Sequence, residues 1–183
     1  MDNTIKIWNL QGELLQTLES HQRAVIAVDF NPIVEGNIKG NTYWLASASW
    51  DTSAKIWRIK KEQQQITGVV EVELQGNQEG LGGVNFSPDG QSIVTVSRDR
   101  SIKLWQNDGT LLKTLFGHDS AVWQAEFDPQ GKTIVSASED NSVIIWDLKR
   151  IDNLDLLAYG CNWVQNYLTH NPNAENPALC TEK

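Results

Sequence analysis

Apolar and polar residues alternate in short runs along residues 1–148, and turn residues such as Gly, Pro, Asp and Asn separate these runs. Alternation with a period of two is the pattern of a β-strand that buries one face. The runs fall into four types that follow one another in a fixed order, and we name them strands a, b, c and d. The pattern predicts an all-β region over residues 1–148 and a different organisation over residues 149–183.

The most regular run is a seven-residue segment that begins with Asp and ends with Trp. It occurs four times without a gap, as DNTIKIW from Asp2, DTSAKIW from Asp51, DRSIKLW from Asp99 and DNSVIIW from Asp140. The copies recur at intervals close to the roughly 40–45 residues of a four-stranded repeating unit. These segments are the predicted c strands, and their repetition indicates a structural unit.

The other three types of run surround the c strands. The a strands are AVIAVDF, GLGGVNF and AVWQAEF, the b strands are YWLASASW, SIVTVSR and TIVSASE, and the d strands are GELLQTLE, VVEVELQ and GTLLKTLF. The segments SPDG and DPQG favour turns after strand a, and the Asp before each strand c can bond its own backbone. The order gives strands c and d, two complete units, and strands a, b and c of a last unit.

This ordered set, together with GHDSAV and the Trp146-Asp147 pair, resembles the WD40 repeat family over roughly residues 1–148. The resemblance implies a β-propeller. About three and a half four-stranded blades are present, whereas propellers have about four to eight. We therefore expect a partial WD40 β-propeller whose ring closure requires missing blades or a partner chain, and a chain that is the C-terminal portion of a longer protein.

The resemblance also implies a hydrogen-bonded tetrad in each blade, made by a His before strand a, a hydroxyl on strand b, the b–c turn Asp and the strand c Trp. Two tetrads are complete, namely His21, Ser47, Asp51 and Trp57, and His118, Ser136, Asp140 and Trp146. In the middle blade the corresponding residues are Asn77, Thr95, Asp99 and Trp105. Ser49 and Ser138 share the strand faces of Ser47 and Ser136 and remain alternatives.

Two features set the middle blade apart. An Asn side chain can donate and accept hydrogen bonds, so Asn77 can still join an altered network. The strand a segment GLGGV offers little side chain to pack, and we expect this to lower the stability of the blade.

The Ser, His and Asp residues also raise the hypothesis of a hydrolase. A catalytic Ser is expected once, at an exposed turn, whereas this pattern recurs from blade to blade. The chain contains no phosphate-binding loop of the GxxxxGK[ST] type and no defensible metal-ligand spacing. We therefore expect a noncatalytic protein-interaction scaffold without cofactor or metal. A nonfunctional remnant of a larger repeat gene is the alternative, and a hydrolase is less favoured.

The composition of the chain disfavours some classes of binding partner. A formal charge of −8 disfavours nucleic acid, because phosphate neutralisation supplies most of nonspecific nucleic-acid binding. No apolar run approaches the roughly 18 residues of a membrane span, and the N-terminal residues lack a signal-peptide pattern, so we expect no membrane partner and a cytoplasmic location. The two cysteines, Cys161 and Cys180, are expected to be reduced thiols, with a disulfide that closes the tail as the alternative.

The pattern changes after Leu148. Apolar residues then step by three or four positions, at Leu154, Leu157, Cys161, Val164 and Leu168, which predicts a short amphipathic helix. The segment LDLLAYGCNWVQNYLTHNP resembles the tails that follow the last repeat of large bacterial WD-repeat proteins, many of which carry an effector domain upstream. We therefore expect a bacterial source, and a helix that packs against the propeller or binds a partner.

Two surfaces are candidates for a protein partner. Residues 31–42 and 58–68 are expected to be loops on one face of the first complete blade, with the positive residues Lys39, Arg58, Lys60 and Lys61. The resemblance points instead to the opposite face, where the b–c turns carry Trp50, Arg98, Arg100 and Glu139. Solvated loops are the alternative for the first surface, and packing of Trp50 against the adjoining blade is the alternative for the second.

Overall fold

The computed structural model describes residues 2–33, 41–63 and 65–152, with side chains up to residue 150. Within these residues it contains thirteen β-strands and one short α-helix. The chain divides into two compact units, Met1–Trp146 and Asp147–Lys183, and each is described by itself.

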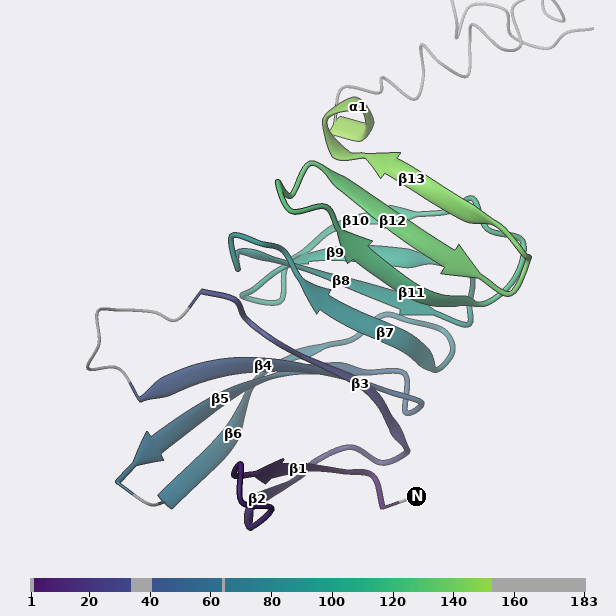
Figure 1. Ribbon diagram of the computed structural model, residues 1–183. Coiled ribbons are helices and arrows are strands. Elements are labelled where there is room, and N and C mark those ends of the chain that lie inside the picture. Colours follow the sequence, from purple (N-terminus) through teal and green to yellow (C-terminus); the bar gives the residue numbers. More distant parts are fainter. Residues whose placement is uncertain (1, 34–40, 64, 153–183) are drawn as a thin grey trace, which may run out of the picture. The chain divides into compact units, whose positions relative to one another are not determined.

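The first unit begins with a two-stranded hairpin and continues with three sheets, which we call the first, second and third blades (Figure 1). The hairpin consists of β1 (Thr4–Trp8) and β2 (Leu14–Glu19). The first blade consists of β3 (Val25–Phe30), β4 (Thr42–Ser49), β5 (Ala54–Glu62) and β6 (Gln65–Leu74). The second consists of β7 (Leu81–Phe86), β8 (Ser92–Ser97), β9 (Ile102–Gln106) and β10 (Leu111–Leu115), and the third of β11 (Val122–Phe127), β12 (Thr133–Ser138) and β13 (Val143–Asp147). The predicted order of strands is confirmed.

The repeated Asp shapes each turn between strands b and c. The carboxylate accepts a hydrogen bond from the backbone N–H two residues later, at 3.0 Å for Asp51, 2.9 Å for Asp99 and 2.8 Å for Asp140. The residue between donor and acceptor has a positive φ in the equivalent turns, at Asn3, Thr52, Arg100 and Asn141. Each Asp therefore stabilises a left-handed step that turns the chain back into strand c.

The first and second blades share one apolar core. Its first-blade side consists of Ala46, Ala48, Ala54, Ile56 and Leu74, and its second-blade side of Leu81, Val84, Phe86, Ile93 and Trp105. Polar contacts also join neighbouring blades, because the Phe86 N–H donates to Asp29 Oδ2 at 2.8 Å and Asn85 Nδ2 donates to the Ala125 carbonyl at 2.8 Å. The first and second blades are thus joined by apolar and polar contacts, and a hydrogen bond joins the second blade to the third.

The outermost faces of the array expose residues whose repeat equivalents are buried. Ile102 of strand β9 is 0% exposed, whereas its equivalent Val143 in β13 is 65% exposed. At the other end, Phe86 in β7 is 6% exposed and its equivalent Phe30 in β3 is 53% exposed. The described residues therefore leave apolar surface uncovered on the third blade and on strand β3 of the first blade.

The glycines of GLGGV have a packing role that the sequence analysis missed. A Cβ atom added to Gly82 would lie 2.6 Å from the Val122 carbonyl oxygen and 3.0 Å from the Trp123 Cα, both in the third blade. The missing side chain at Gly82 lets the β7 and β11 backbones approach closely, and the expected loss of blade stability stays a prediction.

The loop expected at residues 58–68 is a regular hairpin instead. Strand β5 extends to Glu62 and strand β6 starts at Gln65, with Lys60 opposite Thr67 and Lys61 opposite Ile66. Arg58, Lys60 and Lys61 therefore lie on strand β5, and the loop assignment is wrong. Lys39 and most of the other expected loop lie outside the described residues.

The described part of the second unit contains the short helix α1 (Leu148–Asp152). The helix predicted from Leu154 onward, together with both cysteines, lies outside the described residues. No helix among the residues that the structure describes has the length and apolar character to cross a bilayer.

Candidate functional site

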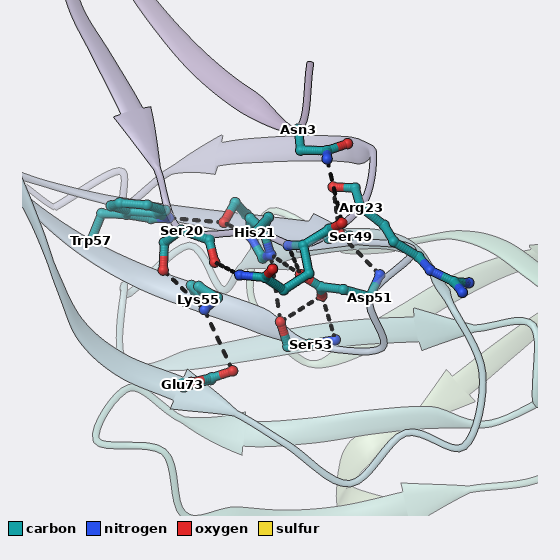
Figure 2. Close-up of polar contacts among 12 residues, drawn as sticks. Asn3, Ser20, His21, Arg23, Ser49, Asp51, Ser53, Lys55, Trp57 and Glu73 are labelled. Carbon is teal, nitrogen blue, oxygen red and sulfur yellow. Dashed lines mark hydrogen bonds and ion pairs between the residues drawn. The ribbon is translucent and has the colours of Figure 1, made fainter. Parts of the chain in front are cut away.

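The first-blade network runs from the indole of Trp57 to the carboxylate of Asp51 (Figure 2). Trp57 Nε1 donates to Ser47 Oγ at 2.8 Å, and this hydroxyl lies 2.7 Å from His21 Nε2. His21 Nδ1 lies 2.8 Å from Asp51 Oδ2. The four members come from four places in the blade, namely strand c, strand b, the segment before strand a and the b–c turn. The network therefore links these parts of the blade by hydrogen bonds.

The charges of this network support a neutral imidazole. Burial lowers the pKa of His21 below its usual 6.5 and outweighs the hydrogen bond with Asp51. Burial raises the pKa of the Asp51 carboxyl, but hydrogen bonds from Ser53, the Gln22 backbone and His21 bring it down to about 2. An ionised carboxylate can only accept, so Nδ1–H donates to Asp51 and Nε2 accepts from the Ser47 hydroxyl.

The third blade repeats this geometry. His118 Nδ1 lies 2.9 Å from Asp140 Oδ2, and His118 Nε2 lies 2.7 Å from Ser136 Oγ. Trp146 Nε1 donates to the same hydroxyl at 2.9 Å. The hydrogen bond from Ser142 holds the pKa of the Asp140 carboxyl well below its usual range. Two tetrads with nearly equal distances therefore stand in the first and third blades.

The second blade has an interrupted network. Trp105 Nε1 donates to Thr95 Oγ1 at 2.8 Å, and Asp99 accepts hydrogen bonds from the Gln78 backbone and from Ser101. The Asn77 side chain is buried, yet neither its amide oxygen nor its amide nitrogen has a hydrogen-bond partner among the described residues. The expectation that Asn77 joins the network through its amide is therefore wrong. Its side chain bonds neither Asp99 nor Thr95, which are the equivalents of the two groups that His21 contacts in the first blade.

Ser49 and Ser138 have a different role from Ser47 and Ser136. The Ser49 hydroxyl donates to the Arg23 carbonyl at 3.1 Å and accepts the Asp51 N–H at 3.1 Å. Ser138 makes the equivalent bonds to the Ser120 carbonyl and the Asp140 N–H, and it also bonds the Ala121 carbonyl. These hydroxyls therefore fasten the b–c turn to the start of strand a, and they do not contact the imidazoles.

The sequence analysis missed two buried lysines. Lys55 Nζ donates to Ser20 Oγ at 3.0 Å and lies 3.5 Å from Glu73 Oε1. Lys103 Nζ donates to Ser101 Oγ at 2.7 Å and lies 3.9 Å from Asp99 Oδ2. The available signal was the Lys four places after the Asp in both c segments, where the third blade has Ile144.

Each tetrad contains the Ser–His–Asp geometry of a hydrolase triad, but the surroundings differ from those of a nucleophile. Ser47 is 0% exposed and Ser136 is 1% exposed. Each hydroxyl is also held by the indole N–H of a Trp. A nucleophilic Ser must reach a substrate carbonyl, so these buried hydroxyls are placed to support the blade.

The b–c turns carry the candidates for partner binding, and of these Trp50 and Arg98 line one groove. Arg98 stacks over the ring of Trp123 in the third blade, with 5.9 Å between the guanidinium carbon and the ring centroid. Arg100 and Glu139 are exposed, and the Ser120 hydroxyl donates to Glu139 at 3.2 Å. Trp50 is half-buried and lies against Gly80 of the neighbouring blade, in line with the packing alternative.

The positive residues Arg58, Lys60 and Lys61 of strand β5 have different surroundings. Arg58 Nε donates to Glu71 Oε1 at 2.5 Å. Lys60 and Lys61 are both exposed, and Lys61 lines a groove beside Phe30 and Tyr43. Across the described residues no group of three or more His, Cys, Asp or Glu side chains is placed to hold a metal ion.

Comparison with known proteins identifies the family to which the sequence is similar. The model of the WD40 family, described as "WD domain, G-beta repeat", matches residues 12–58, 68–106 and 109–147, which together make up more than half of the chain. Nuclear distribution protein PAC1 of Arthroderma benhamiae is 38% identical over 131 residues, which cover 66% of this chain and 26% of the relative. Nuclear distribution protein nudF 1 of Talaromyces marneffei is 35% identical over 123 residues, which cover 66% of this chain and 24% of the relative.

The chain thus spans about a quarter of the length of these relatives. Both relatives are fungal proteins, and the bacterial source expected from the tail finds no support among them. The repeated strand order, the tetrads and the family match agree with one another, and the chain belongs to the WD40 repeat family.

Proposed function

We propose that this chain is a noncatalytic scaffold for protein–protein interaction and forms part of a longer protein. The observation that carries the proposal is the burial of Ser47 and Ser136 inside repeated networks, which leaves the potential nucleophiles without access to substrate. The family match over three repeats and the coverage of about a quarter of the relatives also support it. The cytoplasmic location stays a prediction.

We place the partner-binding surface at the b–c turns. Arg98, Arg100 and Glu139 are exposed there, and the indole of Trp123 lies beside Arg98. Arg and Trp are frequent anchors of protein interfaces because they combine large contact areas with hydrogen-bond donors. This surface carries an Arg side chain of the second blade and a Trp side chain of the third blade next to each other, which favours a protein partner.

The test is affinity capture with chemical cross-linking from an extract of the source organism. The double variant R98E/R100E is compared with the wild type and with the control K132E, since Lys132 is exposed at the turn after strand a. We expect R98E/R100E to reduce recovery of a specific partner at least fivefold and K132E to leave recovery unchanged. Equal recovery by all three proteins would place the interaction elsewhere or exclude it.

The alternative of a nonfunctional remnant makes a different prediction. A remnant would have no specific partner and no cooperative unfolding transition, whereas a scaffold needs both a folded array and a defined surface. Urea unfolding followed by Trp fluorescence separates the two, because most of the strand c indoles are buried or half-buried in the described blades.

A further inference from the structure

A cavity of about 510 Å³ lies between the first and second blades, and none of its described lining residues belongs to a tetrad. Its apolar lining consists of Ile33, Trp44, Ile56, Val72 and Phe86. The remaining lining residues include Glu71, Asp89 and Asp108, and no Lys or Arg is among the described residues that line it. An apolar chamber with acidic groups and no lining cation favours a ligand that carries both apolar surface and positive charge.

The carboxylates of this cavity supply negative charge at neutral pH. The Ser87 hydroxyl hydrogen bond lowers the pKa of the Asp89 carboxyl, and the Thr110 backbone N–H lowers that of the Asp108 carboxyl. Glu71 is already paired with Arg58. Asp89 and Asp108 therefore add two negative charges to the lining beside the paired Glu71.

This lining is not a feature of the repeat. When the blades are aligned on the tetrad hydroxyl, the strand c Trp and the turn Gly, the equivalent of Trp44 in the next blade is Ser92. Val72 is replaced by Lys113, and Asp89 is replaced by Gln130. Repeated residues serve the architecture, whereas this combination of Trp44 with Asp89 is not repeated at the described junction between the second and third blades, which indicates a specific site.

We propose that this cavity binds an arginine side chain from an extended segment of a partner protein, flanked by apolar residues that cover Ile33 and Val72. A guanidinium can stack on the indole of Trp44 and donate paired hydrogen bonds to a carboxylate, which suits this lining better than a compact ammonium does. The assignment rests on the proposed scaffold function and adds a second contact surface to the b–c turns.

The test uses the full chain with ¹⁵N-labelled Trp indoles and three capped peptides, Ac-Leu-Arg-Leu-NH₂, Ac-Leu-Lys-Leu-NH₂ and Ac-Leu-Gln-Leu-NH₂. We expect the arginine peptide to shift the Trp44 indole signal and to bind at least tenfold more tightly than the glutamine peptide and at least threefold more tightly than the lysine peptide. The variant D89N/D108N keeps the acceptor oxygens of both turns and should weaken arginine-peptide binding at least fivefold. The control E139Q, at a b–c turn, should leave it unchanged.

Three results would overturn this assignment. Equal binding of the arginine and glutamine peptides would remove the role of charge, and equal binding of the lysine peptide would remove the preference for a guanidinium. An effect of E139Q without an effect of D89N/D108N would place the peptide at the b–c turns. If the arginine peptide binds as expected while R98E/R100E still captures every partner, the proposed surface at the b–c turns fails and the cavity assignment stands.

Discussion

At the scale of single residues, the tetrads show how far spacing alone can go. The sequence placed His21, Asp51 and Trp57 at the correct turns and strands, because their order relative to the strands recurs in each blade. It could not choose between Ser47 and Ser49, since residues two places apart on a strand share a face. It also could not show that Asn77 lacks a partner, because that depends on the reach of one side chain inside the folded blade.

The first prediction concerns Asn77. The variant N77H should place an imidazole between Asp99 and Thr95, as His21 lies between Asp51 and Ser47, and should remove a buried amide without partners. We expect the free energy of unfolding to rise by about 1–3 kcal/mol, the usual cost of an unsatisfied buried polar group. Urea unfolding measures this change. The reverse variant H118N should lower stability, and a loss of stability in N77H would contradict the account.

The second prediction concerns pH. Because the pKa of His21 is lowered in the folded chain, protonation near pH 6.5 favours the unfolded chain, and stability should fall as pH drops below about 6.5. The pKa of Asp51 is lowered to about 2, so its contribution is present above about pH 4 and is lost as pH falls toward 2. Urea unfolding at pH 7.5 and 5.5 should show a smaller pH-dependent loss for H21N than for the wild type. An identical loss in both proteins would show that His21 is not the titrating group.

At the scale of strands and turns, period-two alternation and the Asp turns predicted the order of the strands, but not their full lengths or their closest contacts. The polar run around residues 60–65 is typical of a loop, yet the hairpin of β5 and β6 continues through it in regular register. The need for glycine at position 82 arises from contact with β11, which belongs to another blade, so local sequence patterns do not reveal it.

The third prediction tests this close approach. The variant G82A adds a methyl group 2.6 Å from the Val122 carbonyl oxygen and should lower the free energy of unfolding by about 1–3 kcal/mol, as overpacking usually does. The matched control is G83A, whose Cβ would have its nearest neighbour, the Trp123 carbonyl oxygen, at 3.3 Å. Chemical unfolding of both variants gives the comparison. A cost for G83A equal to or above that for G82A would contradict the packing described for β7.

At the scale of the whole molecule, comparison of equivalent residues in the repeat shows which apolar side chains are buried and which are exposed. Ile102 is buried, whereas its repeat equivalent Val143 is exposed in the last described blade. Uncovered apolar sheet faces favour association with further protein. The sequence predicted an incomplete set of blades, but it could not identify the partner-binding residues, because single exposed side chains leave no periodic signal.

The central claim is that the repeated Ser–His–Asp–Trp networks support the blades and perform no chemistry. The most direct test is to incubate the folded chain with a fluorophosphonate probe of serine hydrolases and to record its intact mass. The account predicts an unmodified chain, because Ser47 and Ser136 are buried and held by indole N–H groups. A single adduct that maps to Ser47 or Ser136, and disappears in S47A or S136A, would contradict it and identify a catalytic serine.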